Sequence, residues 1–107
     1  MPGYTASKLL WFRDTHPDLY AQMDCILLPH DYVNFYLTGE KAMEAGDASG
    51  TAFMDIRTRQ WSEKMLRIID PSTDLRDRLP SISTAVAPIG SLLPNIAHEL
   101  GLPSGIP

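Results

Sequence analysis

Histidine and cysteine are the residue types in this sequence best suited to bind a metal ion or to act as nucleophiles. The chain has three histidines, His16, His30 and His98, and a single cysteine, Cys25. They fall in separate predicted elements, and none has the spacing to another that metal sites or Cys–His pairs show. We therefore expect no metal site, histidines at the surface, and a Cys25 thiol that behaves as a small buried hydrophobe.

The stretch AGDASGT, residues 45–51, is the second candidate, because small residues with two glycines are typical of phosphate-binding loops. A P-loop needs two glycines five apart, followed by lysine and then serine or threonine. Here Gly46 and Gly50 are four apart and no lysine follows. We expect Asp47 to cap a helical turn while the small residues allow close packing, with direct ligand contact as the alternative.

Lys8 and Asp31 have structural interpretations. Lys8 adjoins a bulky apolar run, which favours a side chain whose stem packs along an amphipathic helix. Asp31 lies at the start of a predicted helix, where a carboxylate satisfies free N–H groups and the helix dipole favours negative charge. Side-chain chemistry alone therefore predicts no catalytic set.

Composition limits the class of protein. The 107 residues are 44% hydrophobic and 21% charged with a net charge of −4, which indicates one small globular domain. No basic cluster points to nucleic acid or an anionic membrane, and no apolar run approaches the roughly 20 residues that span a bilayer. The first residues do not form a secretory signal, and a lone Cys25 fits a reducing cytoplasm. We expect a cytoplasmic protein with no nucleic-acid or membrane partner.

The elements that would position these residues are short, because nine prolines and seven glycines divide the chain. A helix is predicted from Thr5, as its N-cap, through the apolar run at 9–12, which would cover most of the helix circumference and pack on more than one side. Pro17 begins a second short helix. The apolar run at 25–28 predicts a buried strand.

The middle of the chain combines one clear helix with a less regular stretch. Apolar residues at helical spacing predict a helix over 29–38, ended by Gly39. Residues 41–55 predict a turn that leads into a short helical segment between short strands.

Two amphipathic helices are predicted in the last part. The first has Trp61, Met65, Ile68 and Ile69 on its apolar face and ends before Pro71. A loop-rich stretch follows, and then a last helix capped by Gly101. Its apolar face comprises Leu92, Leu93, Ile96, Ala97 and Leu100. The elements together predict a mostly α domain of about five short helices with minor strands.

Four blocks of the sequence, in this order, resemble the central part of the FGGY family of carbohydrate kinases, with the greatest likeness to its bacterial xylulose kinases. The blocks are MPGYTASKLLWFRD, ILLPHDYVNFYLTGE, GDASGTAFMDIRTRQWSEKML and IGSLLPNIAHELGLPSGIP. The first block matches the family's first signature except at Thr15, where an amide, Glu or His is usual. The matching residues are Gly3, Thr5, Lys8, Leu9, Trp11, Phe12 and Asp14.

The resemblance implies ATP-dependent phosphorylation of a sugar hydroxyl. It implies an α+β, mostly α fold: the helical part of an actin-like, ribonuclease-H-like N-terminal domain with a few short strands. Residues 1–107 would be a partial domain that lacks the opening phosphate-loop strands, the catalytic aspartate motif and the C-terminal nucleotide domain. ATP and Mg²⁺ would then belong to the parent enzyme, a homodimer by expectation, and the isolated chain would be inactive.

The resemblance also implies where substrate would lie. Gly3 and Tyr4 are the residues expected near the sugar, because relatives that phosphorylate glycerol have a tyrosine at the Gly3 position and glycine leaves room for a pentulose. D-xylulose is the expected substrate, with gluconate, ribulose or glycerol as alternatives. A freestanding helical binding module is the alternative from another functional class.

The remaining matched residues are expected to be structural, and no catalytic or metal-binding residue is expected in this segment. Asp47 belongs to the GDASGT block and not to the catalytic motif, so it is not expected to be the base. The structural set is Lys8, Trp11, Asp31, Asp47, Gly50 and Trp61. If the chain is part of a larger domain, an apolar patch should be exposed at Trp11, Phe12, Tyr32, Tyr36 and Trp61. The ending GLPSGIP would then lead into a buried strand.

Overall fold

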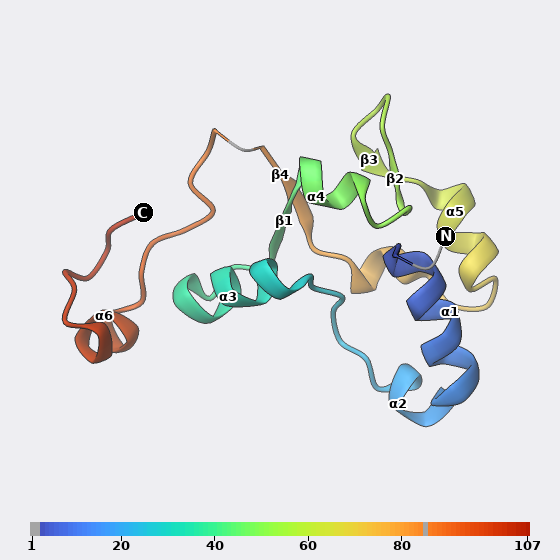
Figure 1. Cartoon of the computed structure of the whole chain (residues 1–107), viewed down its shortest axis with the longest axis horizontal. Helices are drawn as coiled ribbons and strands as arrows, with labels where there is room; N and C mark the ends of the chain where they lie inside the picture. Colours follow the sequence, from blue (N-terminus) through green and yellow to red (C-terminus); the bar gives the residue numbers. More distant parts are fainter. Residues whose placement is uncertain (1–2, 85) are drawn as a thin grey trace.

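The computed structural model describes residues 3–84 and 86–107 and contains short helices joined by short strands and loops (Figure 1). This confirms the expected mostly helical character. The elements in chain order are α1 (Thr5–Thr15), α2 (Pro17–Ala21), α3 (Pro29–Thr38), β1 (Ala42–Glu44), α4 (Ala45–Ser49), β2 (Met54–Asp55), β3 (Gln60–Trp61), α5 (Glu63–Ile69), the 3₁₀ helix η1 (Leu75–Arg78), β4 (Ser81–Ser83) and α6 (Pro94–Leu100).

The strands form two separate pairs. β1 runs parallel to β4, with Met43 opposite Ile82, and β2 runs antiparallel to β3, with Met54 opposite Trp61. The prediction of a buried strand at 25–28 was wrong, because these residues pair with neither of the two sheets and form irregular structure. No described helix is long and apolar enough to cross a bilayer.

The main core lies where α1, α2, α5 and η1 meet. Phe53 and Leu75 are fully inaccessible at its centre. The other buried members are Leu9, Tyr20, Ile26, Leu66 and Ile69. Burial of these apolar side chains is the main source of stability for this half of the molecule.

A second, smaller cluster joins α6 to α3 at the opposite end of the molecule (Figure 1). Its buried residues are Leu92, Ile96 and Ala97, against which Leu37 and Leu93 pack. Leu100, which was expected on the buried face, is 57% exposed. α6 is therefore held by a much smaller apolar contact than α1 or α5.

The helix boundaries confirm the predicted ends better than the predicted starts. Gly39 and Gly101 have φ values of +79° and +67°, the left-handed conformation that glycine adopts readily at a helix C-terminus. Thr5 is not the N-cap of α1, because Tyr4 occupies that position and Thr5 is the first helical residue. Asp47 is not the cap of α4 either, since the Glu44 carboxylate accepts the free N–H groups there.

The buried face of α5 also differs from the expectation. Ser62 caps α5 and Trp61 belongs to β3, so the helix begins later than predicted. Leu66 and Ile69 are buried, whereas Ile68 is 61% exposed. Pro71 follows the end of the helix as expected.

Candidate functional site

The segment that contains α4 is the point at which several elements with predicted site residues come together. The backbone N–H of Ala6, in the first turn of α1, donates to the C=O of Thr51 just after α4 (3.1 Å). On another side, His30 at the start of α3 contacts Asp47 of α4. The GDASGT block thus links the N-terminal ends of α1 and α3, although the sequence separates all three.

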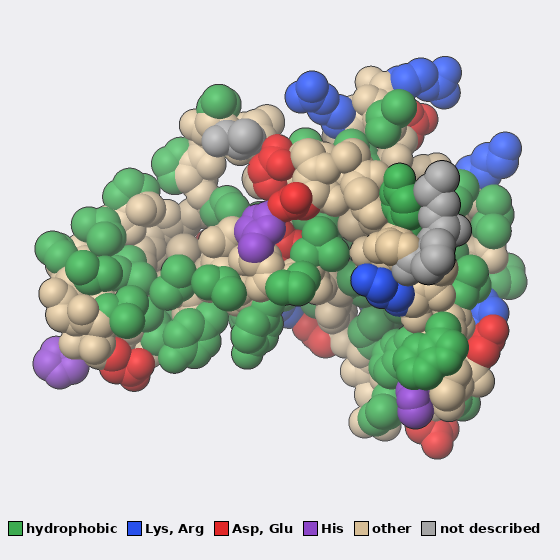
Figure 2. Space-filling view, viewed as in Figure 1, with side chains coloured by type: hydrophobic (Ala, Val, Ile, Leu, Met, Phe, Trp, Pro, Cys, Tyr) green, Lys and Arg blue, Asp and Glu red, His purple; other side chains and the backbone are tan. Residues whose placement is uncertain are grey.

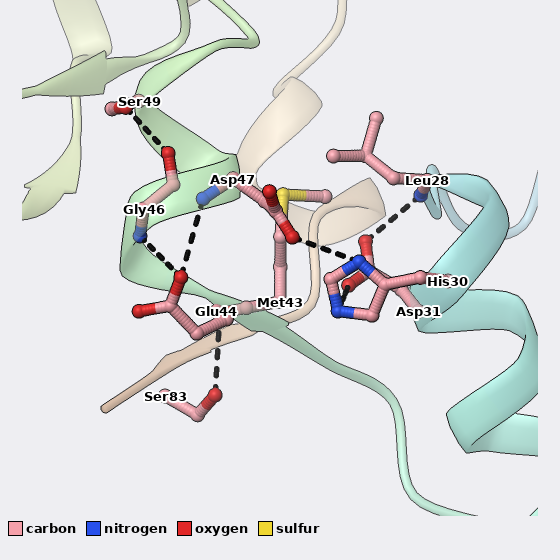
Figure 3. Close-up of polar contacts among 9 residues, drawn as sticks. All are labelled: Leu28, His30, Asp31, Met43, Glu44, Gly46, Asp47, Ser49 and Ser83. Atoms are coloured by element: carbon pink, nitrogen blue, oxygen red, sulfur yellow. Dashed lines mark hydrogen bonds and ion pairs between the residues drawn. The ribbon is translucent and has the colours of Figure 1, made fainter. Parts of the chain in front are cut away.

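Asp31 is the most deeply buried member of this group, with an exposed fraction of 0%. It lies at the third position of α3, and its Oδ2 accepts the backbone N–H of Leu28 at 2.9 Å at the start of the helix (Figure 3). Its Oδ1 has no hydrogen-bond partner among the described residues. Burial raises the pKa of Asp31, while the Leu28 N–H and the nearby His30 oppose that rise.

His30 bridges two carboxylates from different helices. Its Nδ1 lies 2.8 Å from Oδ2 of Asp47, and its Nε2 lies 3.5 Å from Oδ1 of Asp31 (Figure 3). The imidazole is about half exposed, so solvent screens both contacts. The bridge fixes the start of α3 against α4.

Glu44 is the N-cap residue of α4, the helix that carries Asp47. Its Oε2 accepts the N–H groups of Gly46 (2.6 Å) and Asp47 (3.3 Å). A Cβ on Gly46 would lie 2.6 Å from the same oxygen, so a side chain there would displace the cap. Ser49 Oγ donates to the Gly46 carbonyl within the turn (2.5 Å).

This geometry is suited to positioning and not to bond making. Both His30 ring nitrogens face carboxylates, so the imidazole is not directed at a hydroxyl or thiol as the base of a nucleophile would be. Within residues 3–84 and 86–107, no group of three or more His, Cys, Asp or Glu side chains could hold a metal ion. Burial raises the pKa of the Cys25 thiol, which keeps it protonated.

The structure brings only some of the sequence-predicted residues into this group. Gly3 and Tyr4 precede α1 close to the Thr51 end of the block, and both are exposed. Gly50 ends α4 with an ordinary right-handed conformation. Asp31 and Asp47 belong to the group through His30.

Lys8, Trp11 and Trp61 lie elsewhere. Lys8 and Trp11 line a shallow surface hollow on α1 with Ser7 and Phe12, and Trp11 is 60% exposed. Trp61 packs against the main core, and its indole Nε1 donates to the Pro80 carbonyl at 2.8 Å. Of the expected exposed aromatics, Trp11, Tyr32 and Tyr36 are more than half exposed, whereas Phe12 and Trp61 are partly covered.

Sequence reasoning missed the two residues that connect the group, His30 and Glu44. His30 was expected to be a surface histidine, and its side chain is half exposed, but its contact with Asp47 was not predicted. Glu44 precedes Gly46 and Asp47 at a spacing from which a carboxylate can cap a short helix, and that signal was available. The His30 contact depends on the tertiary placement of α4, which local spacing does not reveal.

Comparison with known proteins places this arrangement in a family. The whole chain, residues 1–107, matches the family model of the FGGY family of carbohydrate kinases, N-terminal domain. A xylulose kinase of Haemophilus influenzae is 42% identical over 99 residues, covering 92% of this chain and 20% of that protein. An L-fuculokinase of Salmonella typhi is 38% identical over 104 residues, covering 96% of this chain and 21% of that protein.

A solved structure agrees with the sequence relatives. The crystal structure of a xylulose kinase from Brucella ovis superposes with a TM-score of 0.89 at 30% identity, covering 99% of this chain and 21% of that chain. The chain therefore spans about one fifth of the length of the relatives it matches. By its sequence along all 107 residues and by its fold, the chain belongs to the N-terminal domain of the FGGY family of carbohydrate kinases.

Proposed function

We propose that the chain is a segment of an ATP-dependent kinase that phosphorylates a pentulose, D-xylulose. The observation that carries the proposal is the 42% identity to the Haemophilus influenzae xylulose kinase over 92% of the chain. Phosphoryl transfer of this kind depends on a Mg²⁺-bound nucleotide, on positioning, and on a carboxylate that takes the hydroxyl proton. A cytoplasmic location and a homodimeric parent are part of the same proposal.

The residues of this chain would contribute positioning. Where the structure describes the chain, no side-chain group fits a metal ion, and residues 45–51 do not have the P-loop pattern. We therefore assign no step of the transfer to these residues and expect no ATP or Mg²⁺ to bind to them in isolation. Gly3 and Tyr4 are proposed to lie beside the sugar, at the junction of α1 with the GDASGT block.

A second candidate function has its own observation. The L-fuculokinase of Salmonella typhi is 38% identical over 96% of the chain, so L-fuculose is an alternative substrate. Gluconate, ribulose and glycerol remain the alternatives within the family. A freestanding helical binding module is the alternative outside enzymology.

A chimaera tests the choice of substrate. The 99 residues of the Haemophilus influenzae xylulose kinase that match this chain would be replaced by this chain, and kcat/KM would be measured for each candidate sugar with ATP and Mg²⁺. We expect D-xylulose to have the highest value, close to that of the unaltered enzyme. A chimaera that prefers L-fuculose or gluconate would contradict the pentulose assignment.

The isolated 107-residue chain provides the matching control. We expect no sugar-dependent ATP turnover from it, because it presents no base or nucleotide site among the described residues. Measurable turnover that depends on the sugar would contradict the positioning role.

A further inference from the structure

Thr51 is a fully buried polar residue whose contacts reach the first turn of α1. Its exposed fraction is 0%, and it is the last residue of the GDASGT block. Its hydroxyl donates to the Ala48 carbonyl at 2.6 Å and accepts the backbone N–H of Phe53 at 3.0 Å. Such a hydroxyl holds the backbone on both of its sides, because breaking either bond would leave a polar group unpaired in the interior.

The turn that Thr51 holds contains a strained residue. Ala52 has a φ of +65°, a left-handed conformation that costs conformational energy in a residue with a Cβ. The next residue, Phe53, is fully buried in the main core, and its carbonyl accepts the N–H of Ser62 at 2.7 Å. A strained conformation persists only where the surrounding contacts hold it, and the Thr51 hydroxyl spans this one from Ala48 to Phe53.

The backbone carbonyl of Thr51 contacts the start of α1. It accepts the N–H of Ala6, the second residue of that helix, at 3.1 Å. The first N–H groups of a helix have no acceptor within the helix, and the N-cap residue Tyr4 makes no side-chain hydrogen bond to them. Thr51 therefore supplies, from a distant part of the sequence, an acceptor that the residues before α1 do not.

The same contact bears on the two residues proposed to lie beside the sugar. Tyr4 directly precedes α1, and its carbonyl accepts the Ser7 hydroxyl at 2.9 Å, which ties Tyr4 to the first turn of the helix. Gly3 and Tyr4 are both exposed, and a Cβ at Gly3 would meet no atom of the described residues beyond its chain neighbours within 4 Å. The position of both residues therefore depends on the turn of α1 that follows them.

The segment around Thr51 is anchored on two further sides. His30 Nδ1 lies 2.8 Å from Asp47 Oδ2, and Figure 2 shows a histidine beside acidic side chains at the surface between α3 and α4. On the other side, Phe53 is held by the main core. Because α4 and Phe53 are both fixed, the bonds of the Thr51 hydroxyl to them fix the Thr51 carbonyl as well, and with it the place where α1 begins.

We propose that Thr51 is a positioning residue for the sugar site, because its hydroxyl fixes the carbonyl that holds Ala6 and thereby places Gly3 and Tyr4 beside the substrate. Thr51 is buried and acts through Ala6, not by touching the sugar. The link to the sugar rests on the proposed function, whereas the hold on α1 rests on the contacts alone. A displacement of about 1 Å far from the reacting atoms can slow a reaction about a hundred-fold, so a remote hydroxyl can affect the reaction.

Two substitutions of Thr51 test the proposal. Thr51→Val keeps the shape of the side chain and removes the hydroxyl, whereas Thr51→Ser keeps the hydroxyl. In the chimaera with the Haemophilus influenzae enzyme, Thr51→Val should raise KM for D-xylulose about ten-fold, with KM for ATP unchanged and kcat changed less, and Thr51→Ser should stay close to the parent. In the isolated 107-residue chain, the amide of Ala6 should exchange about ten-fold faster in Thr51→Val than in Thr51→Ser.

Two control variants separate positioning from a loss of stability. Ala52→Gly keeps the hydrogen bonds of the turn and relieves its left-handed strain, so neither KM for the sugar nor exchange at Ala6 should change. Ile69→Ala opens a cavity in the main core near the other end of α1, where the Ile69 carbonyl accepts the Arg13 guanidinium. It should lower the melting temperature without raising KM for the sugar. If Thr51→Val does not fold, Thr51→Ala removes the hydroxyl without placing a methyl group beside the unpaired N–H.

Three outcomes would overturn the proposal. Equal exchange at Ala6 in Thr51→Val and Thr51→Ser would show that the hydroxyl does not hold α1. Faster exchange at Ala6 with an unchanged KM for the sugar would remove the link to the substrate. A rise in KM that Ile69→Ala reproduces would reflect lost stability alone. A chimaera that prefers another candidate sugar contradicts only the D-xylulose assignment, and KM for that sugar then decides the role of Thr51. If the unsubstituted chimaera phosphorylates none of them, the proposed function fails, while exchange at Ala6 still decides the hold on α1.

Discussion

Asp31 and Asp70 are both buried, yet their surroundings change their acidity in opposite directions. Burial raises the pKa of Asp31, because a single backbone N–H and a half-exposed His30 do not compensate for lost hydration. Burial acts on Asp70 in the same sense, but hydrogen bonds from Ser72, Tyr20 and Thr73 outweigh it and lower the pKa of Asp70 below its usual range. The number of donors decides which carboxylate stabilises the fold as an anion.

The first prediction concerns Asp31. Asp31→Ala should reduce the free energy of unfolding by about 1–3 kcal/mol, because the Leu28 N–H would be left without its acceptor. Asp31→Asn should cost less, since an amide oxygen can accept the same hydrogen bond. Urea unfolding of the 107-residue chain measures both, with the exposed Glu99→Ala as a control within about 0.5 kcal/mol of the parent. Equal losses for Ala and Asn would contradict the capping role.

The second prediction concerns Gly3, which is proposed to leave room for the sugar. In the chimaera, Gly3→Tyr should raise KM for D-xylulose roughly ten-fold or more, because a ring would occupy that space. A Cβ at Gly3 meets no atom of the described residues beyond its chain neighbours within 4 Å, so the melting temperature should not change. Gly3→Ala is the steric control. An unchanged KM in a folded Gly3→Tyr chimaera would remove this residue from the proposed substrate wall.

At the scale of the element, the sequence predicted the ends of helices better than their packing faces. The helix ends predicted at Gly39 and Gly101 were correct, because the left-handed conformation that ends a helix is a local requirement which glycine meets readily. The predicted apolar face of α5 was right for Ile69, which is buried, and wrong for Ile68, which is 61% exposed. Trp61 shares the helical spacing of Met65 and Ile68 but lies in β3, where it pairs with Met54. Local periodicity fits both a helix that includes Trp61 and a helix that begins after it, and the pairing of Trp61 with Met54 decides for the second.

Asp70 supports the third prediction, which is about the junction of α2 with α5. Its Oδ2 accepts the Tyr20 hydroxyl (2.8 Å), and its Oδ1 accepts the N–H groups of Ser72 and Thr73 and the Ser72 hydroxyl. Because the folded-state pKa is lowered, the stabilisation is present above the unfolded pKa of about 3.9 and is lost as pH falls through and below that value. Asp70→Asn should therefore be less stable than the parent at pH 7, with the difference shrinking by roughly 1–3 kcal/mol at pH 2.5.

Urea unfolding at pH 7 and pH 2.5 measures that difference. Tyr20→Phe is the control, because it removes one donor and keeps the charge. Burial and the bond to Asp70 raise the pKa of Tyr20 to about 12, so the tyrosine is neutral at both pH values and should add little pH dependence of its own. If the difference in unfolding free energy between the unsubstituted chain and Asp70→Asn did not change with pH, the assigned role of Asp70 would be contradicted.

At the scale of the whole molecule, the family resemblance predicted what local patterns could not. Membership of the FGGY family follows from blocks spread over the chain, and the comparisons confirm it. The mostly helical fold already followed from local periodicity. The His30 bridge and the hydrogen bond from Ile26 to Arg78 depend on how segments that are far apart in the sequence meet. A single sequence carries little information about such contacts.

The molecule has two apolar clusters of unequal size, and this division leads to the last prediction. α6 is held by Leu92, Ile96 and Ala97 against Leu37 and Leu93, whereas α1 and α5 share the larger main core (Figure 1). In the isolated chain, amides of α6 should therefore exchange by local opening, roughly a hundred-fold faster than those of Leu66 and Ile69, because less apolar surface holds them closed. Leu37→Ala should accelerate exchange in α6 and leave α5 unchanged, while Leu75→Ala should accelerate exchange in α5 and change α6 far less, since α6 already exchanges through a local opening that is more frequent than global unfolding. Hydrogen exchange followed by mass spectrometry or NMR measures these rates, and equal protection of α6 and α5 would show that the two clusters unfold as one unit.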